Sequence, residues 1–282
     1  MKKKLITEKN QAAYREQLKS EEKAPATIEK YLRDLLAFSR WLEGTPVAKK
    51  NATEYKRYLL EVLGREAVGV NAVISALNSF FAFMDWDIRL KPYKIQKPTF
   101  LPEEKILTKE EYSRLVRAAV NNGNVRLSLV LQAICATGIR VSELKFITVK
   151  AIRAGQAEIT SKGKTRIVFI PRKLKLLLLT YAMKKGITSG PIFVTKNGNP
   201  LHRSNIWAEM KKLSIEAGVD PAKVFPHNLR ALFARTFYEL DPDLAKLADL
   251  LGHTSVNTTR IYLRGSGKEH RRRVEALGLV IT

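Results

Sequence analysis

The sequence has a single cysteine, Cys135, among its 282 residues, so it cannot form an internal disulfide. It has no run of apolar residues near the roughly 18 that a membrane-spanning helix needs. The basic opening MKKKLITEKN is not followed by the apolar segment of a secretory signal. These absences predict a cytoplasmic protein that does not associate with a membrane.

The sequence also lacks the common patterns for binding a metal or a nucleotide. One cysteine cannot build a thiolate site for zinc, and no two histidines have the HExxH spacing of a metalloprotease. The segment GKT at 163–165 lacks the upstream glycine of a phosphate-binding loop. The histidines are His202, His227, His253 and His270. We therefore expect a protein that uses no metal and no cofactor.

Acidic residues are scarce relative to basic ones. The chain has 50 Lys and Arg against 27 Asp and Glu, a net charge of +23. Residues 1–107 carry 20 basic and 14 acidic side chains, a net charge of +6. Residues 108–282 carry 30 basic and 13 acidic side chains, a net charge of +17. Such an excess favours a polyanionic partner, and nucleic acid is the leading candidate.

The first part of the chain has the periodicity of an all-helical domain. Residues 25–44 place apolar side chains on one helical stripe, with Thr27 as the expected N-cap and Gly44 as the stop. Similar patterns recur at 51–64 and 68–86. Prolines and lysines without a sustained period then indicate a linker. We predict a helical domain at 1–92 and a linker at 93–107.

The second part, 108–282, is expected to be helical with one small antiparallel sheet. Thr108 and Glu111 have the spacing of a capping box at a helix start, and an apolar helix is expected at 125–138. Residues 156–171 alternate around a Lys-Gly-Lys turn, which is typical of a hairpin of two strands. Helical patterns then continue to the end. The predicted fold class is mainly α, with a mixed α+β second domain.

Four short segments of this second part carry polar residues suited to phosphate chemistry. Taken singly, each is more typical of a solvated helix end, an exposed turn or a structural hydrogen bond. They are ATGIRVSEL with Arg140 and Glu143, TSKGKTR with Lys162 and Lys164, HNLR with His227 and Arg230, and LGH with His253 followed nine residues later by Tyr262.

In this order, the four segments resemble the active-site signature of the tyrosine recombinases, the phage integrase family. The resemblance implies an N-terminal helical, SAM-like core-binding domain at 1–92 and a catalytic domain with a C-terminal tail at 108–282. It also implies a site-specific recombinase that cleaves and rejoins DNA through a covalent 3′-phosphotyrosyl intermediate, without metal or ATP.

The resemblance assigns a role to each residue. Arg140 and Arg230 would bind the phosphate, for which a permanently charged fork of donors is well suited. Lys162 would be the general acid, with Lys164 as the alternative, because the spacing between these lysines departs from the usual family pattern. Tyr262 would be the nucleophile. His227 would assist proton transfer at the tyrosine, His253 would hydrogen-bond the phosphate, and Glu143 would help to orient the site, although a plain surface charge is nearly as typical of its position.

The resemblance also implies partners. It predicts double-stranded DNA recombination sites, bound by a homo-tetramer or by a hetero-tetramer with a related recombinase, and an accessory DNA-bending protein in some systems. Two other functions share these residue types. A type IB topoisomerase-like enzyme would have the same chemistry without site choice, and a non-catalytic basic DNA-binding protein would form no covalent product.

Overall fold

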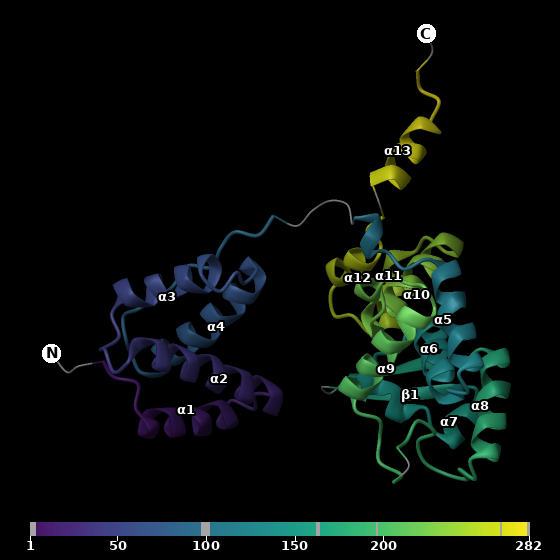
Figure 1. Ribbon diagram of the computed structural model, residues 1–282, viewed down its shortest axis with the longest axis horizontal. Coiled ribbons are helices and arrows are strands. Elements are labelled where there is room, and N and C mark those ends of the chain that lie inside the picture. The colour runs from purple at the N-terminus through teal and green to yellow at the C-terminus, as the bar shows by residue number, and fades with distance from the viewer. Residues whose placement is uncertain (1–3, 97–101, 162–163, 196, 266, 281–282) are drawn as a thin grey trace. The chain divides into compact units, whose positions relative to one another are not determined.

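The computed structural model describes residues 4–96, 102–161, 164–195, 197–265 and 267–280 (Figure 1). The chain folds into two compact units, residues 1–97 and residues 98–282. The first unit is all helical. Its helices are α1 (Glu8–Ser20), α2 (Pro25–Leu42), α3 (Lys49–Glu61) and α4 (Ala67–Phe83).

The core of the first unit is rich in aromatic side chains. Helix α2 packs against α1, α3 and α4. Phe38 of α2 meets Tyr55 of α3 at a ring-centroid distance of 4.9 Å, and Tyr14 of α1 meets Phe80 of α4 at 5.2 Å. Aromatic pairs of this kind add to the stability that burial alone provides. The three helical patterns of the sequence therefore correspond to α2, α3 and α4.

One local expectation for this unit was wrong, and one helix was missed. Helix α2 begins at Pro25 and has Ala24 as its N-cap, so Thr27 lies inside the first turn and caps nothing. Proline suits this position because the first helical N–H has no partner in any case. Helix α1 was not expected at all, because only Tyr14 and Leu18, four residues apart, are buried in it.

The residues that follow α4 are tied to the first unit by two asparagines. Asn78 exchanges two hydrogen bonds with the backbone of Leu90, and Asn71 exchanges two with the backbone of Tyr93. At the other end of the predicted linker, Leu107 is fully buried in the core of the second unit. The two ends of this segment are therefore anchored, one in each unit.

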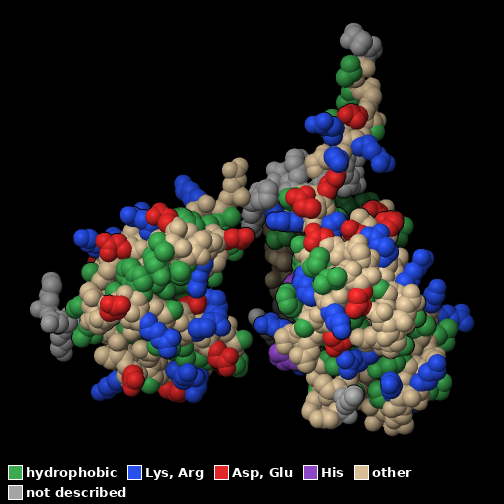
Figure 2. Space-filling view, in the orientation of Figure 1, with side chains coloured by type: hydrophobic (Ala, Val, Ile, Leu, Met, Phe, Trp, Pro, Cys, Tyr) green, Lys and Arg blue, Asp and Glu red, His purple; other side chains and the backbone are tan. Residues whose placement is uncertain are grey.

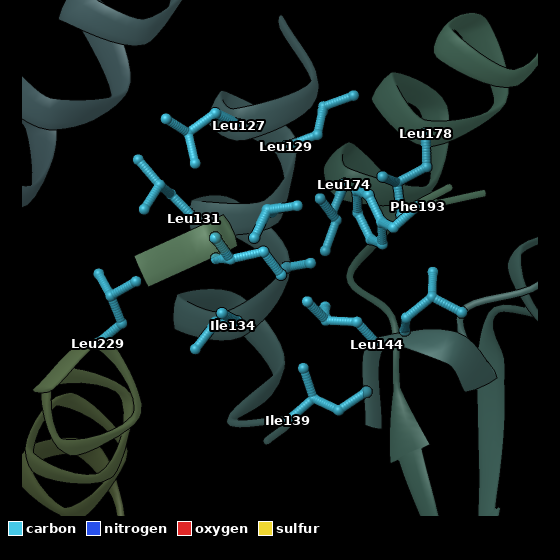
Figure 3. Close-up of a cluster of buried hydrophobic side chains, with 14 of the residues drawn as sticks. Leu127, Leu129, Leu131, Ile134, Ile139, Leu144, Leu174, Leu178, Phe193 and Leu229 are labelled. Carbon is cyan, nitrogen blue, oxygen red and sulfur yellow. The ribbon is translucent and has the colours of Figure 1, made fainter. Parts of the chain in front are cut away.

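The second unit is built around α6 (Val125–Thr137), against which α5 (Lys109–Asn121), α8 (Arg172–Lys184) and α10 (Pro226–Leu240) pack. Most of its side chains are buried, among them Leu131 and Ile134 (Figure 3). Thr108 and Glu111 form the predicted capping box at the start of α5. The elements of this unit are η1 (Glu103–Lys105), α5 (Lys109–Asn121), α6 (Val125–Thr137), η2 (Val141–Phe146), α7 (Val149–Ala154), β1 (Gln156–Ser161), β2 (Lys164–Phe169), α8 (Arg172–Lys184), α9 (Arg203–Glu216), η3 (Pro221–Lys223), α10 (Pro226–Leu240), α11 (Leu244–Leu251), α12 (Val256–Tyr262) and α13 (Gly267–Glu275).

Strands β1 and β2 form the predicted antiparallel hairpin, with a register that runs from Gln156 opposite Phe169 to Ser161 opposite Lys164. Ile159 and Val168 point into the core. The fold-class prediction of a mainly helical chain with one small antiparallel sheet is confirmed. Within the described ranges, no helix is long and apolar enough to cross a membrane.

The C-terminal tail exposes its apolar residues. Val274, Leu277, Leu279 and Val280 are all more than half exposed, and they lie in or just after α13. Lys268 of the same helix forms an exposed ion pair with Glu103. In this structure the apolar side chains of the tail are therefore not covered by their own unit.

Candidate active site

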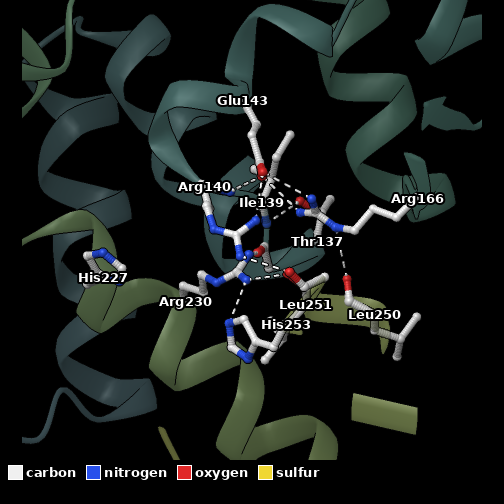
Figure 4. Close-up of polar contacts among 12 residues, drawn as sticks. Thr137, Ile139, Arg140, Glu143, Arg166, His227, Arg230, Leu250, Leu251 and His253 are labelled. Carbon is white, nitrogen blue, oxygen red and sulfur yellow. Dashed lines mark hydrogen bonds and ion pairs between the residues drawn. The ribbon is translucent and has the colours of Figure 1, made fainter. Parts of the chain in front are cut away.

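Four of the sequence segments meet on the second unit (Figure 4). Helix α6 ends at Thr137, and its C-cap Gly138, with a φ of 65°, turns the chain so that Arg140 is the N-cap of η2. Helix α10 supplies His227 and Arg230, and the end of α11 and helix α12 supply His253 and Tyr262. Lys162 lies outside the described residues, as does the side chain of Lys164, whose backbone begins β2.

Arg230 is the most buried polar side chain of the group, at 1% exposure. Its guanidinium donates to the carbonyls of Gly138 and Leu251 and, through Nη2 at 3.1 Å, to Nε2 of His253. Its Nε is buried and has no hydrogen-bond partner among the described residues. Burial and the neighbouring Arg140 lower the pKa of Arg230 to about 10, so it remains a cation at neutral pH.

Arg140 is held at two points but remains one-third exposed. Its Nη1 donates to Oε1 of Glu143 at 2.8 Å, and its Nη2 donates to the carbonyl of Gly252 at 3.1 Å. Its backbone N–H donates to Oε2 of Glu143 at 2.8 Å. One acidic side chain thus fixes both the backbone and the side chain of Arg140.

Glu143 is 4% exposed, so the view of it as a plain surface charge was wrong. Arg166 donates to both of its carboxylate oxygens, at 3.0 and 2.8 Å. Burial alone would raise the pKa of Glu143, but the hydrogen bonds from Arg166 and Arg140 outweigh it and hold the pKa at about 2. Glu143 is therefore a buried carboxylate shared by two arginines.

Sequence reasoning missed Arg166. A signal for it exists, because Arg166 stands two residues before the buried Val168 on β2 and so shares its inward face. An arginine that points inward needs an acidic partner. With few carboxylates in this part of the chain, Glu143 was an available candidate.

Tyr262 is half-buried at the end of α12, between the two histidines. Its hydroxyl lies 3.0 Å from Nδ1 of His227. Its ring stacks on His253 with centroids 5.3 Å apart and planes 9° from parallel, and the guanidinium of Arg230 lies 6.0 Å from its centre. The predicted nucleophile, both histidines and Arg230 are thus brought together.

The hydrogen bonds around His253 fix its protonation. An arginine can only donate, so Nε2 of His253 accepts from Arg230 and carries no proton. The proton is then on Nδ1, which donates to Oγ1 of the buried Thr259 at 2.8 Å. Burial and then Arg230 lower the pKa of His253 to about 4, and the same two causes lower the pKa of His227. Both rings are therefore neutral at physiological pH.

Two open clefts flank this cluster. One, of about 520 Å³, is lined by Arg140, His227 and Arg230 together with Arg203 and Trp207 of α9. The other, of about 750 Å³, has Arg140, Arg166 and His253 in its wall. Arg140 lies in the wall of both clefts.

The chemistry of the cluster suits an anion with several oxygens. Within the described ranges, no group of three or more His, Cys, Asp or Glu could hold a metal ion. On the face shown in Figure 2, Lys and Arg are spread over both units instead of forming one patch. The arginines of the cluster are therefore brought together by tertiary contacts and are not part of one broad basic surface. Their guanidinium groups match the geometry of a phosphate.

Comparison with known proteins agrees with this chemistry. The model of the phage integrase family matches residues 105–269, and that of the phage integrase N-terminal SAM-like domain matches residues 12–87. Tyrosine recombinase XerD of Xanthomonas campestris is 33% identical over 267 residues, which cover 85% of this chain and 82% of XerD. Tyrosine recombinase XerA of Pyrococcus furiosus is 31% identical over 273 residues, which cover 93% of this chain and 92% of XerA.

Solved structures share the fold. A lambda integrase dimer bound to a COC′ core site matches with a TM-score of 0.74 at 19% identity, over 93% of this chain and 96% of the other. XerH recombinase bound to a palindromic difH substrate matches with a TM-score of 0.72 at 21% identity, over 88% and 78%. The chain therefore belongs to the phage integrase family. It is a tyrosine-type site-specific recombinase, an enzyme that cleaves and rejoins DNA, and it is similar to XerA and XerD.

Proposed function

We propose that this recombinase cleaves DNA by attack of the Tyr262 hydroxyl on a backbone phosphate, which leaves a 3′-phosphotyrosyl bond and a free 5′ hydroxyl. The new ester keeps the energy of the broken bond, so a 5′ hydroxyl from another duplex reverses the step without metal or ATP. The observation that carries the proposal is the place of Tyr262, whose hydroxyl is 3.0 Å from His227 and whose ring stacks on His253 and lies 6.0 Å from the Arg230 guanidinium.

Arg140 and Arg230 would stabilise the negative charge that builds up on the phosphate. Preorganised donors aimed at developing charge are commonly the largest contribution to such a reaction. Arg140 is exposed to the clefts while it is held by Glu143, and Arg230 has a buried Nε without a partner among the described residues. Arg140 therefore already borders the space where a phosphate would bind, and Arg230 keeps one donor that no described residue uses.

The two histidines would handle protons. His227 is neutral because its pKa is lowered, so its Nδ1 can accept the proton of Tyr262. To hydrogen-bond the phosphate, His253 must instead carry its proton on Nε2, where it now accepts from Arg230. Thr259 permits this change, because its hydroxyl can accept from Nδ1–H or donate to a bare Nδ1.

The general acid for the departing 5′ oxygen would be Lys162, with Lys164 as the alternative. In the sequence, Lys162 follows β1 and Lys164 begins β2. Strand β2 also carries Arg166, which reaches the cluster. The hairpin therefore runs beside the proposed phosphate site. Substituting each lysine separately, with a substrate whose 5′ oxygen is replaced by a better leaving sulfur, distinguishes them, because only loss of the true acid is rescued.

The enzyme would act on double-stranded DNA in the cytoplasm as a tetramer that pairs two recombination sites. One solved relative is a lambda integrase tetramer bound to a Holliday junction. In this chain the exposed Val274, Leu277 and Leu279 need a cover, and a neighbouring protomer would provide it. Deleting residues 268–282 should keep single-site binding and abolish four-protomer complexes in native mass spectrometry. A truncated chain that still assembles four protomers contradicts this role.

The nucleophile is tested with a nicked duplex that carries a sequence recovered by binding selection from a random library. Wild-type protein should form a covalent adduct that maps to Tyr262, and Tyr262→Phe should bind the duplex without forming one. Tyr238→Phe is the matched control, because Tyr238 packs against the same small buried cluster as Tyr262 and its substitution should leave the adduct unchanged. An adduct in the Tyr262→Phe variant overturns the assignment.

A further inference from the structure

Three arginines hold three successive backbone carbonyls. Arg166 Nε donates to Leu250 at 3.3 Å, Arg230 donates to Leu251, and Arg140 Nη2 donates to Gly252 at 3.1 Å. These carbonyls stand at the end of α11, where a helix leaves its last carbonyls without internal partners and carries partial negative charge. His253 follows directly, so its position depends on this turn.

Of the three arginines, Arg166 differs in how its donors are used. Both of its terminal nitrogens bind Glu143, and its Nε binds the turn. The side chain of Arg166 is 13% exposed, whereas that of Arg140 is one-third exposed. A guanidinium whose three nitrogens each bind a protein acceptor is less free to turn toward a phosphate, although Arg166 borders the cleft in which one would lie.

The charges show what Arg166 contributes. The cluster holds three arginines and one carboxylate, and its two histidines are neutral, so its net charge is +2. Without Arg166, the carboxylate of Glu143 would be balanced by Arg140 alone. Glu143 would then neutralise the charge of Arg140 more completely, so the electrostatic attraction of Arg140 for an anion would be weaker.

We propose that Arg166 is a positioning residue for DNA cleavage, acting through Glu143 on Arg140 and through the Leu250 carbonyl on the turn that carries His253. It satisfies one edge of the carboxylate, so Glu143 can orient Arg140 without neutralising it. It also links β2, η2 and the end of α11 into one rigid frame. The inference rests on the proposed roles of Arg140 and His253 at the scissile phosphate.

A matched ion pair elsewhere controls for a purely structural effect. Arg126 of α6 binds Glu209 of α9 at 3.0 Å and also donates to the carbonyl of Val194. It therefore joins a carboxylate and a backbone carbonyl, as Arg166 does, but it lies outside the cluster. Arg126→Met removes the same kinds of contact and should leave cleavage unchanged.

The test measures single-turnover cleavage at saturating protein, and the dissociation constant, on the selected nicked duplex. Arg166→Met should lower the cleavage rate about tenfold or more and change the dissociation constant less than about threefold, as expected for lost preorganisation. In a Glu143→Gln background, the same substitution should cost clearly less than in the wild type, because the part of the effect that passes through Glu143 is already lost and only the contact with the Leu250 carbonyl remains.

The outcomes separate the possibilities. Additive losses, an unchanged rate in Arg166→Met, or a parallel loss of binding and cleavage each overturn the role of Arg166. A loss of cleavage in Arg126→Met as large as that in Arg166→Met also overturns it. If Arg166→Met does not fold, Arg166→Lys, which keeps the charge but loses the fork, is compared in both backgrounds. Absence of any wild-type adduct counts against the proposed function instead.

Discussion

An added methyl group at Gly252 should displace Arg166 without changing any polar residue. Gly252 ends α11 with a φ of 63°, and a Cβ built there would lie 2.6 Å from Cδ and 2.9 Å from Nε of Arg166. An arginine side chain normally moves aside at little cost. Here its guanidinium is fixed by Glu143 and by the Leu250 carbonyl, so moving it breaks those hydrogen bonds.

The expected size of the effect has two parts. A left-handed backbone costs an alanine about 1–2 kcal/mol relative to glycine. Weakening a hydrogen bond of a charged group adds roughly 1.5–3 kcal/mol. Gly123→Ala is the control for the first part, because Gly123 has a φ of 70° and nothing within 4 Å of an added Cβ.

The assay combines thermal unfolding with cleavage of the nicked duplex. For a unit of this size, Gly123→Ala should lower the Tm of the second unit by roughly 2–8 °C, since 1 kcal/mol corresponds to about 2–4 °C. Gly252→Ala should lower it further and should reduce cleavage about tenfold or more, as loss of preorganised donors does. Wild-type cleavage by Gly252→Ala, or an equal loss of cleavage in Gly123→Ala, refutes the reasoning.

Three further substitutions or titrations test the site. Arg140→Lys keeps the charge but loses the fork, so cleavage should fall about a hundredfold while affinity for the duplex changes little; a parallel loss of both would make Arg140 a binding contact only. Thr259→Val removes the hydroxyl that His253 needs, so cleavage should fall about tenfold, whereas Thr259→Ser keeps it; equal rates in the two variants would contradict the tautomer argument. In NMR titration of the free protein, the His253 ring should titrate with a pKa near 4, and a value of 6.5 or above contradicts the packing described. Because this folded pKa lies below that of an unfolded histidine, the unfolded state takes up the proton first, and stability should fall as pH drops from about 6.5 toward 4.

Local chemistry accounts for what the sequence could predict. Apolar periodicity or a capping box predicts helices α2 to α6, and the alternation of residues around a turn predicts the hairpin. The six residues proposed as catalytic come from motifs that are spread along the chain from Arg140 to Tyr262. Only the order of those motifs, compared with a known family, indicated that they belong together.

What escaped prediction depends on contacts between distant segments. The proposed role of Arg166 depends on its contacts with Glu143, 23 positions away, and with the carbonyl of Leu250, 84 positions away. In the sequence, Thr259 is one of several threonines in a polar stretch, and nothing there indicates that its hydroxyl hydrogen-bonds His253. Helix α1 has only two buried residues, and its stability comes from packing on α2.

The arrangement of arginines carries a cost that an anion would remove. Arg230 is buried beside Arg140, and these like charges, together with burial, lower the pKa of Arg230. The carbonyls of Leu251 and Gly252 offset part of this repulsion, and Glu143 offsets another part. None of these partners is a full negative charge placed between Arg140 and Arg230, which is where a phosphate would stand. A phosphate bound there would meet guanidinium groups that Glu143 and the end of α11 already hold in place, so little reorganisation would be needed as its charge grows during cleavage.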